Sequence, residues 1–239
     1  MRAVALIPAR GGSKRLPRKN VIDFLGRPIL AYTIEAARSS GCFERVVVST
    51  EDEEIAGVAR QYGAEVDRRS ASLATDVASV VDVCCDFLDR EELSGRSWER
   101  MAVLYATAPL RGDEDIRRTI ALLAPGVCDF AMAVTSFDLP PHQALKIGPD
   151  GSLAPMWPKL ISKRGSDLPA LRVDNGSTYA VDVGAFRRCR SFYGPGLRGH
   201  DMGRERSIDI DTQRDLDVAV WEAQRLSLDG SQVARRGVE

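Results

Sequence analysis

The stretch that decides the fold is VALIPARGGSKRLPRKN, Val4 to Asn20, in which a short apolar run stops at Pro8. Two glycines, a serine and five basic residues follow before Asn20. A short apolar run that ends at a proline predicts a buried strand followed by a loop. The whole chain of 239 residues has a net charge of −1, so the positive charge is a local feature of this one loop.

Beyond this loop, strand and helix patterns alternate along the chain. Apolar residues at helical spacing predict helices over 28–40, 52–63, 76–90 and 113–124, the third capped by Thr75 or Asp76. Runs of apolar and β-branched residues predict strands over 45–50, 101–106 and 129–137. This alternation is typical of parallel βαβ units whose helices cover both faces of the sheet. We therefore expect an α/β fold, with the basic loop at the carboxyl edge of the sheet, where such folds bind ligands.

The rhythm changes after Phe137. Residues 138–172 are rich in proline and show little helical periodicity, and a hairpin is expected around Pro149-Asp150-Gly151. Met156 and Trp157 would be costly to expose unless a partner covered them, so this stretch is predicted to be a lobe inserted over the sheet. A last helix is predicted from Gln213 to about Leu228. Residues 1–228 are thus read as a single domain, followed by a polar tail over 229–239 that is expected to fray.

The composition excludes several classes of protein. Hydrophobic residues make up 44% and charged residues 28% of the chain, which is ordinary for a soluble globular protein. No run approaches the roughly 18 apolar residues of a membrane span, and the apolar N-terminal run is too short for a signal peptide. A near-neutral chain without an aromatic and basic face is not expected to bind nucleic acid. We expect a cytoplasmic protein.

The first loop has the chemistry of a polyphosphate site. Gly11 and Gly12 let backbone N–H groups approach an anion, and Ser13 adds a hydroxyl donor. The basic side chains add positive charge and are Arg10, Lys14, Arg15, Arg18 and Lys19. The loop matches neither the Walker pattern nor G-x-G-x-x-G. The alternative is a solvated basic loop, which its place after the first strand makes less favourable.

Two further stretches point to the same edge of the sheet. In SIDIDT, Asp209 and Asp211 are two residues apart, so on an extended segment both side chains face one side. Two carboxylates at a sheet edge suit a hard divalent cation, above all Mg²⁺. The alternatives are a strand with a polar face, or a helix cap made by Asp211 and Thr212. In YATAPLR, Tyr105 to Arg111, small residues leave room for a ligand.

Taken together, IPARGGSKRLPRKN, LGRPILAYTIEAA, VVVSTEDEEIAGVARQYGAEV and SIDIDTQRDLDVA resemble the acylneuraminate cytidylyltransferases, the CMP–sialic acid synthetase family. The similarity runs from about Val4 to about Ala223. It implies a Rossmann-like three-layer nucleotidyltransferase fold with a mostly parallel sheet and a small inserted lobe that makes a homodimer. It also implies transfer of CMP from CTP to the anomeric hydroxyl of a nonulosonic acid, a nine-carbon 2-keto sugar acid, with Mg²⁺ and release of pyrophosphate.

The resemblance implies a role for each matching residue. The nucleotide-binding positions are Arg10, Gly11, Gly12, Ser13, Lys19, Asn20 and Arg69. The metal positions are Asp209 and Asp211. The positions that line the acceptor pocket are Tyr105, Lys146, Arg164, Asn175 and Tyr179. Catalytic roles fall to Arg10, Lys19 and Asp211. A bidentate Arg164 would suit the carboxylate of the acceptor.

The identity of the acceptor stays open. Tyr105 stands where sialic acid enzymes usually have glutamine, and ISKRGSDLP, Ile161 to Pro169, is similar to the pseudaminic and legionaminic acid branches. The stretch VDNGSTY, however, departs from the HDAGQFY of the pseudaminate branch. Two alternatives are a nucleotidyltransferase for a different acid, such as a Kdo-type sugar or a small phosphonate, and a non-catalytic nucleotide-binding module.

Overall fold

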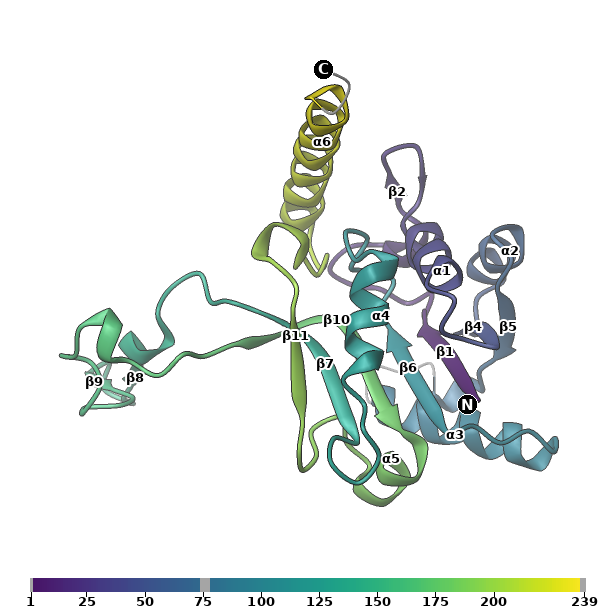
Figure 1. The fold of residues 1–239 in the computed structure, drawn as a ribbon, viewed down its shortest axis with the longest axis horizontal. Coiled ribbons are helices and arrows are strands. Elements are labelled where there is room, and N and C mark those ends of the chain that lie inside the picture. Colours follow the sequence, from purple (N-terminus) through teal and green to yellow (C-terminus); the bar gives the residue numbers. More distant parts are fainter. Residues whose placement is uncertain (1, 74–77, 237–239) are drawn as a thin grey trace.

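The structure of the chain is a computed structural model that describes residues 2–73 and 78–236. At its centre is a seven-stranded sheet of order β11-β7-β10-β6-β1-β4-β5 (Figure 1). Its strands are β1 (Ala3–Pro8), β4 (Arg45–Thr50), β5 (Glu65–Arg68), β6 (Arg100–Leu104), β7 (Phe130–Thr135), β10 (Val173–Asp182) and β11 (Arg198–Asp201). Two small sheets pair β2 (Asp23–Phe24) with β3 (Arg27–Pro28) and β8 (Leu145–Ile147) with β9 (Leu153–Pro155).

The sheet is mostly parallel, as the sequence predicted. β1 pairs in parallel with β4 and β6, β4 with β5, and β11 with β7. β10 is the exception, because it pairs antiparallel with both β6 and β7. The chain reaches β10 from the projecting segment after β7, without a helix that crosses over the sheet. Parallel neighbours need such a crossover, whereas antiparallel neighbours do not.

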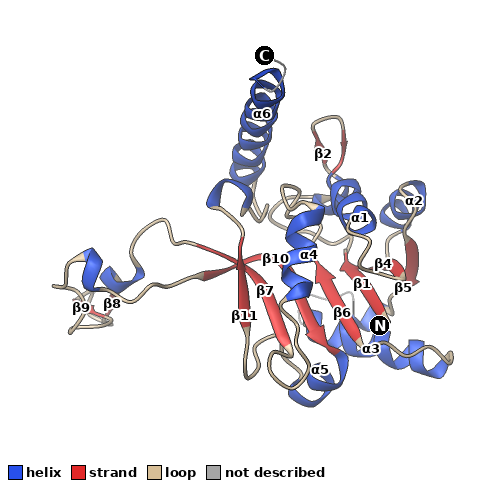
Figure 2. Cartoon of the chain, in the orientation of Figure 1, coloured by secondary structure: helices blue, strands red, loops and turns tan. Residues whose placement is uncertain are grey.

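Five helices cover the two faces of the sheet (Figure 2). On one face lie α1 (Ile29–Ser39), α2 (Glu53–Gln61) and α4 (Asp113–Ala121), and on the other lie α3 (Val80–Leu93) and α5 (Val183–Cys189). Side chains of β1 alternate between the two cores: Ala5 and Ile7 pack under the first group, Val4 and Leu6 under the second. All four are fully buried, as expected for a strand covered on both faces.

The predicted helices all form, with ends that differ by up to three residues in α1, α2 and α4 and by more in α3 and α6. α3 begins at Val80 and not at Asp76, because Ser79 and Asp82 form a capping box; Thr75 and Asp76 lie outside the described residues. α6 (Gln213–Arg236) continues past Leu228, so the predicted end of the last helix is wrong. The single Gly230 lowers helix stability by about 1 kcal/mol relative to alanine, which does not stop a helix of this length. The remaining short helices are η1 (Lys19–Val21), η2 (Ala71–Leu73), η3 (Pro141–Gln143), η4 (Gly165–Asp167) and η5 (Arg204–Arg206).

Between β7 and β10 the chain forms an arm that projects from the body, with the β8–β9 hairpin near its outer end (Figure 1). The predicted hairpin is confirmed, and Gly151 supplies the positive φ of its turn. Large apolar side chains of the arm are exposed: Phe137, Leu139, Leu145, Ile147, Leu153, Met156, Trp157, Ile161 and Leu171. Within residues 2–73 and 78–236, no helix has the length and apolar character needed to cross a membrane.

A third apolar cluster joins the two ends of the chain. Leu16 of the first loop packs with Phe24, Ile210 and Leu216. Ile210 is fully buried there, and its backbone N–H donates to the carbonyl of Thr107 just after β6 (2.9 Å). This packing holds the basic loop and the SIDIDT segment side by side.

Candidate active site

A cleft of about 600 Å³ opens where the carboxyl ends of β1 and β6 meet. The chain leaves β1 toward β4 on one side, while β6 lies on the other, so this is the point at which ligands bind in open α/β sheets. Its walls are the first loop, the turn after β6, the start of α3 and the segment before α6. The residues that line it are Pro8, Arg10, Ser13, Lys14, Arg15, Lys19, Asn20, Arg69, Leu73, Ala78, Val80, Val83, Tyr105, Ala106, Thr107, Asp209 and Asp211.

The first loop is held in shape by polar contacts behind the cleft. The buried Asn20 side chain donates to the carbonyl of Arg10 (2.8 Å), and the N–H of Gly11 donates to Glu51 (2.8 Å). Arg18 turns away from the cleft and pairs with Asp52 through both guanidinium NH₂ groups (2.6 and 3.0 Å). Of the five basic residues in the loop, Arg18 therefore acts as a clamp on the loop, while the other four line the cleft.

The two glycines of the loop have different surroundings. A Cβ atom on Gly11 would lie 2.5 Å from Asp52 Oδ2, so only glycine lets the chain pass this carboxylate. A Cβ on Gly12 would meet no atom within 4 Å. Neither glycine lines the cleft, and the Gly11 N–H is already used by Glu51. The glycines thus serve the path of the loop, and the cleft-facing donors come from Ser13 and the basic side chains.

Arg69 forms part of the cleft wall and is 8% exposed. Its Nη2 donates to the carbonyl of Ser49 (2.6 Å), and its Nε has no hydrogen-bond partner within the described chain. Burial lowers the pKa of this guanidinium, and the carboxylates of Glu51 and Asp67 oppose that shift. A buried cation with an unused donor is suited to an anionic or carbonyl-bearing ligand.

The SIDIDT segment is extended but belongs to no strand of the sheet. With Ile210 buried between them, Asp209 and Asp211 turn to the opposite side, and both line the cleft. Solvent reaches Asp209 from the cleft, yet protein atoms surround it closely. This desolvation raises the pKa of Asp209, a hydrogen bond from Thr107 lowers it, and the charge of Asp211 raises it.

Asp211 is held by two cations of the first loop. Its Oδ1 accepts from Lys19 Nζ (2.7 Å) and its Oδ2 lies 2.7 Å from a guanidinium nitrogen of Arg15. Thr212, not Asp211, caps α6, because the Thr212 hydroxyl accepts the N–H of Asp215. The two aspartates are therefore available to the cleft, and the helix-cap alternative applies to Thr212 alone.

The donor set suits a divalent cation that takes further ligands from a bound phosphate. Among the residues that the structure describes, no group of three or more His, Cys, Asp or Glu side chains could hold a metal by itself. Mg²⁺ is usually bound by one or two carboxylates together with phosphate oxygens of the substrate. Asp209 and Asp211 beside a cationic loop provide this arrangement.

A second, wider cleft of about 1090 Å³ meets the first at Asp209, which lines both. Asn175 lies in its wall and donates to the Ser207 hydroxyl (3.0 Å). Next to it, Asp174 accepts hydrogen bonds from the hydroxyls of Tyr179 (2.8 Å) and Tyr193 (2.6 Å). The shared aspartate gives the two clefts one meeting point, as a transfer between two substrates requires.

Two of the predicted acceptor residues form an aromatic pair. Tyr105 is half-buried in the first cleft, and its ring centroid lies 5.5 Å from that of the buried Tyr179. Burial raises the pKa of both hydroxyls, so both are neutral donors at physiological pH. Asp174 and Tyr193 are not among the residues predicted from the sequence. Asp174 lies in the VDNGSTY stretch that was singled out, whereas no local pattern marks Tyr193.

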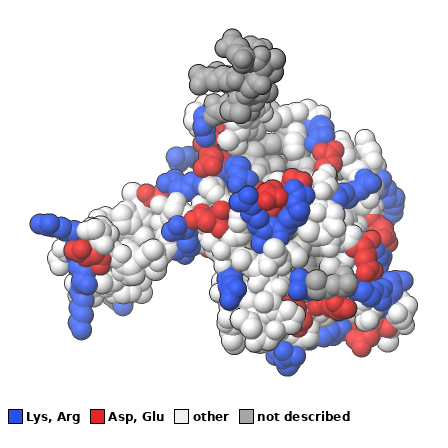
Figure 3. Space-filling model, viewed as in Figure 1, with Lys and Arg blue, Asp and Glu red and all other residues white. Residues whose placement is uncertain are grey.

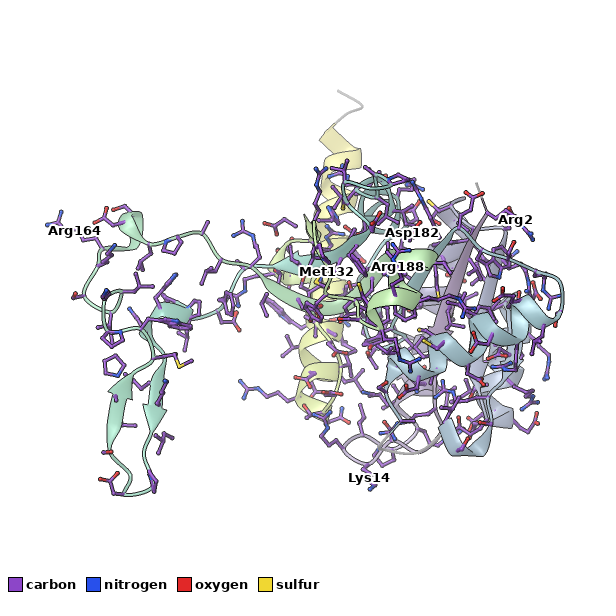
Figure 4. All side chains as sticks on the ribbon, turned by 90° about the horizontal axis from the view of Figure 1, so that it is seen from below. Arg2, Lys14, Met132, Arg164, Asp182 and Arg188 are labelled. Atoms are coloured by element: carbon purple, nitrogen blue, oxygen red, sulfur yellow. The ribbon has the colours of Figure 1, made fainter. Side chains whose placement is uncertain are left out.

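Lys146 and Arg164 lie on the arm and line neither cleft. Figure 4 shows Arg164 at the outer end of the arm, whereas Lys14 lies at the edge of the body. Basic side chains gather at this outer end (Figure 3). Both residues are exposed. They are thus separated from Tyr105, Asn175 and Tyr179 within the chain, which sequence spacing alone did not indicate.

The fold and the two clefts define a nucleotidyltransferase-type α/β protein. A sequence model of the family described as Cytidylyltransferase matches residues 4–128, just over half of the chain. The chain is also 34% identical over 220 residues to a pseudaminic acid cytidylyltransferase of Campylobacter jejuni, covering 92% of this chain and 95% of that protein. The chain belongs to the cytidylyltransferase family.

Other relatives extend the comparison. The chain is 35% identical to a CMP-N,N'-diacetyllegionaminic acid synthase of Legionella pneumophila, covering 90% of this chain and 93% of the relative. Among solved structures, CMP:2-keto-3-deoxy-manno-octonic acid synthetase in complex with CTP superimposes with a TM-score of 0.71 at 15% identity, over 94% of this chain and 99% of that one. The structural likeness confirms the Rossmann-like nucleotidyltransferase fold that the sequence predicted.

Proposed function

We propose that the chain transfers CMP from CTP to the anomeric hydroxyl of a nonulosonic acid and releases pyrophosphate. The observation that carries the proposal is that a cationic cleft and a second, wider cleft meet at Asp209. The relatives named for pseudaminic and diacetyllegionaminic acid support the acceptor class.

The first cleft is proposed to bind CTP. Arg10, Ser13 and Lys19 would face the triphosphate, and Arg69 would meet the nucleoside end beside the start of α3. Asn20 would position Arg10 by its hydrogen bond to the Arg10 carbonyl. Gly11 and Gly12 would contribute indirectly, by allowing the loop to follow its path past Asp52. Phosphoryl transfer asks the protein mainly for positioning and charge neutralisation, which this set supplies.

The catalytic roles are proposed for Arg10, Lys19 and Asp211. Arg10 and Lys19 stabilise negative charge on the phosphate groups while the acceptor hydroxyl attacks the α-phosphorus. Asp209 and Asp211 would hold Mg²⁺, which when bound neutralises phosphate charge and favours deprotonation of the attacking hydroxyl. No residue of the cleft is required to form a covalent intermediate.

The second cleft is proposed to bind the acceptor. Asn175 lines the second cleft, Tyr105 lines the first, and Tyr179 lines neither but packs against the Tyr105 ring. The neutral Tyr105 hydroxyl would favour recognition of hydroxyl and amide groups of the acceptor. Lys146 and Arg164 would reach an acceptor only from the arm of a second copy. The exposed apolar side chains of the arm support a homodimer, because isolated arms of this kind are costly in water.

The location is proposed to be the cytoplasm. All five cysteines are free thiols, Cys84 and Cys85 adjacent and buried among them, which is typical of a reducing compartment.

Pyrophosphate release tests the function. The enzyme is mixed with CTP, UTP, GTP or ATP and with sialic, legionaminic, pseudaminic or Kdo acid. We expect release with CTP and at least one nonulosonic acid, and a loss of several orders of magnitude in Asp211→Ala with the fold intact by circular dichroism. CTP binding without pyrophosphate release from any acceptor would instead identify a non-catalytic nucleotide-binding module.

Mixed dimers test the role of the arm. An Arg164→Ala chain is combined with an Asp211→Ala chain, each inactive or impaired alone. If the arm serves the partner's cleft, one of the two sites in the mixed dimer carries both defects and the other carries neither, so activity returns. Mixed dimers that stay inactive, or a chain that sediments as a monomer at assay concentrations, would refute this part of the proposal.

A further inference from the structure

Both carboxylate oxygens of Asp211 are occupied in the structure by cations of the first loop. Oδ1 accepts from Lys19 Nζ at 2.7 Å, and Oδ2 lies 2.7 Å from Arg15. Lys19 and Asp211 are 192 positions apart in the sequence, so only the tertiary fold creates their contact. A divalent cation needs these same oxygens, because Mg²⁺ and Mn²⁺ bind carboxylates through oxygen lone pairs.

We infer that Arg15 and Lys19 keep the Asp211 carboxylate occupied until the phosphates of a nucleoside triphosphate attract both cations away from it. The chain then accepts its divalent cation together with the nucleotide and not before it. This inference rests on the proposed function for the identity of the nucleotide, and it assigns Arg15 a role that its place in the loop did not indicate.

The charges of the cleft favour this order. Asp209 and Asp211 contribute two negative charges, and Lys19 and Arg15 balance them, so a cation that arrives alone meets a neutralised pair of ligands. A triphosphate brings about four negative charges and offers the two loop cations better partners.

The two cations differ in how firmly they hold Asp211. The Lys19 side chain is 17% exposed and the Arg15 side chain 69%, while Asp211 is 31% exposed. Water screens exposed ion pairs, so these pairs contribute little binding energy. Lys19 therefore contributes more than Arg15 to keeping a metal ion away from Asp211. Arg15 is the cation that leaves first, since its long side chain is free to move in solvent.

Mn²⁺ binding without nucleotide tests the inference, with electron paramagnetic resonance of free Mn²⁺ as the readout. The variants are Lys19→Met, Arg15→Met and Lys19→Met with Asp211→Asn. Arg18→Met is the matched control, because it removes one positive charge from the same loop but pairs with Asp52 and Glu54 instead of Asp211.

We expect Lys19→Met to bind Mn²⁺ about tenfold more tightly than the unchanged chain, and Arg15→Met about two- to threefold more tightly. Arg18→Met should stay within twofold. Adding Asp211→Asn to Lys19→Met should abolish the gain, which locates the new site. Lys19→Met would thus improve metal binding while it impairs CMP transfer, a pair of effects that a purely structural role for Lys19 would not produce.

Equal or weaker Mn²⁺ binding by Lys19→Met, or a gain that survives Asp211→Asn, would overturn the inference. Either result can be told apart from failure of the proposed function, because the titration contains neither nucleotide nor acceptor. As a second check, the unchanged chain should bind a nonhydrolysable CTP analogue more tightly with Mn²⁺ present, since coupling between two ligands is reciprocal. Independent binding of the two would also refute the proposed order.

Discussion

Replacing Arg111 by methionine should destabilise the whole domain. Arg111 is 2% exposed, and its guanidinium donates to the carbonyls of Ser177 (2.7 Å) and Tyr105 (3.2 Å) and to the hydroxyl of Thr33 (2.6 Å). It therefore joins the end of β6, strand β10 and helix α1. Burial lowers the pKa of Arg111 to about 10, which leaves it charged at neutral pH.

The magnitude follows from these three hydrogen bonds. A hydrogen bond from a charged donor contributes roughly 1.5–3 kcal/mol, which would total about 4.5–9 kcal/mol for three. Two terms reduce this figure: methionine removes the cost of burying a charge, and both carbonyls keep a second donor, from Tyr105 N–H and from Thr33. We therefore expect a loss of about 3 kcal/mol in the free energy of unfolding, or about 6–12 °C in Tm for a domain of this size.

Urea denaturation followed by circular dichroism and tryptophan fluorescence would measure the loss. Arg117→Met is the matched control, since Arg117 lies on α4 in exposed ion pairs with Asp113 and Glu114 and should change stability by less than about 0.5 kcal/mol. If Arg111→Met were as stable as the control, the argument that this buried guanidinium ties β6, β10 and α1 together would be wrong. An unfolded Arg111→Met protein would show that the contribution is larger than estimated.

Three further predictions concern the first loop and the metal aspartates. The ion pair with Arg18 lowers the pKa of Asp52 from 3.8 to about 2, so this pair stabilises the fold above pH 4. The difference in unfolding free energy between the unchanged chain and Arg18→Met should shrink as the pH falls from 4 toward 2. A constant difference would contradict the assignment. Gly11→Ala should raise the KM for CTP strongly, because its Cβ would collide with Asp52, whereas Gly12→Ala should leave it nearly unchanged; steady-state kinetics with equal effects would refute the steric argument. Desolvation raises the pKa of Asp209, so its charged form destabilises the fold once the pH exceeds the pKa of an ordinary carboxyl group. Asp209→Asn should therefore be more stable than the unchanged chain at pH 7 but not at pH 3, and it should lose pyrophosphate release. A variant that is less stable at pH 7 would contradict the shift.

Much of the sheet follows from local sequence. The run from Ala3 to Pro8 is apolar without alternation because helices cover both of its faces, and the structure has β1 over those residues. The strand predicted over Arg45–Thr50 has those bounds, and the α1 helix departs from the prediction by one residue at each end. Such elements depend on side chains within one or two turns of each other, so their pattern is visible in the chain itself.

The candidate site could be predicted in part for the same reason. SIDIDT needs only its alternation to put Asp209 and Asp211 on one side, and the loop after β1 needs only its place to reach the carboxyl edge of the sheet. The predicted start of α3 was wrong because Thr75 and Asp76, two suitable capping residues, precede Ser79. The capping box between Ser79 and Asp82 fixes the helix start at Val80, and it forms only together with the helix.

The sequence by itself determined the alternating α/β architecture, the cationic loop and the paired aspartates, because each depends on periodicity or composition over a few residues. Tertiary structure alone decided which groups use that chemistry. It turns Arg18 and the Gly11 N–H toward Asp52 and Glu51, brings Lys19 to Asp211, and carries Arg164 away on the arm. These outcomes depend on packing between segments far apart in the chain, above all the burial of Ile210 against Leu16, and no local pattern encodes which distant segment will supply the partner.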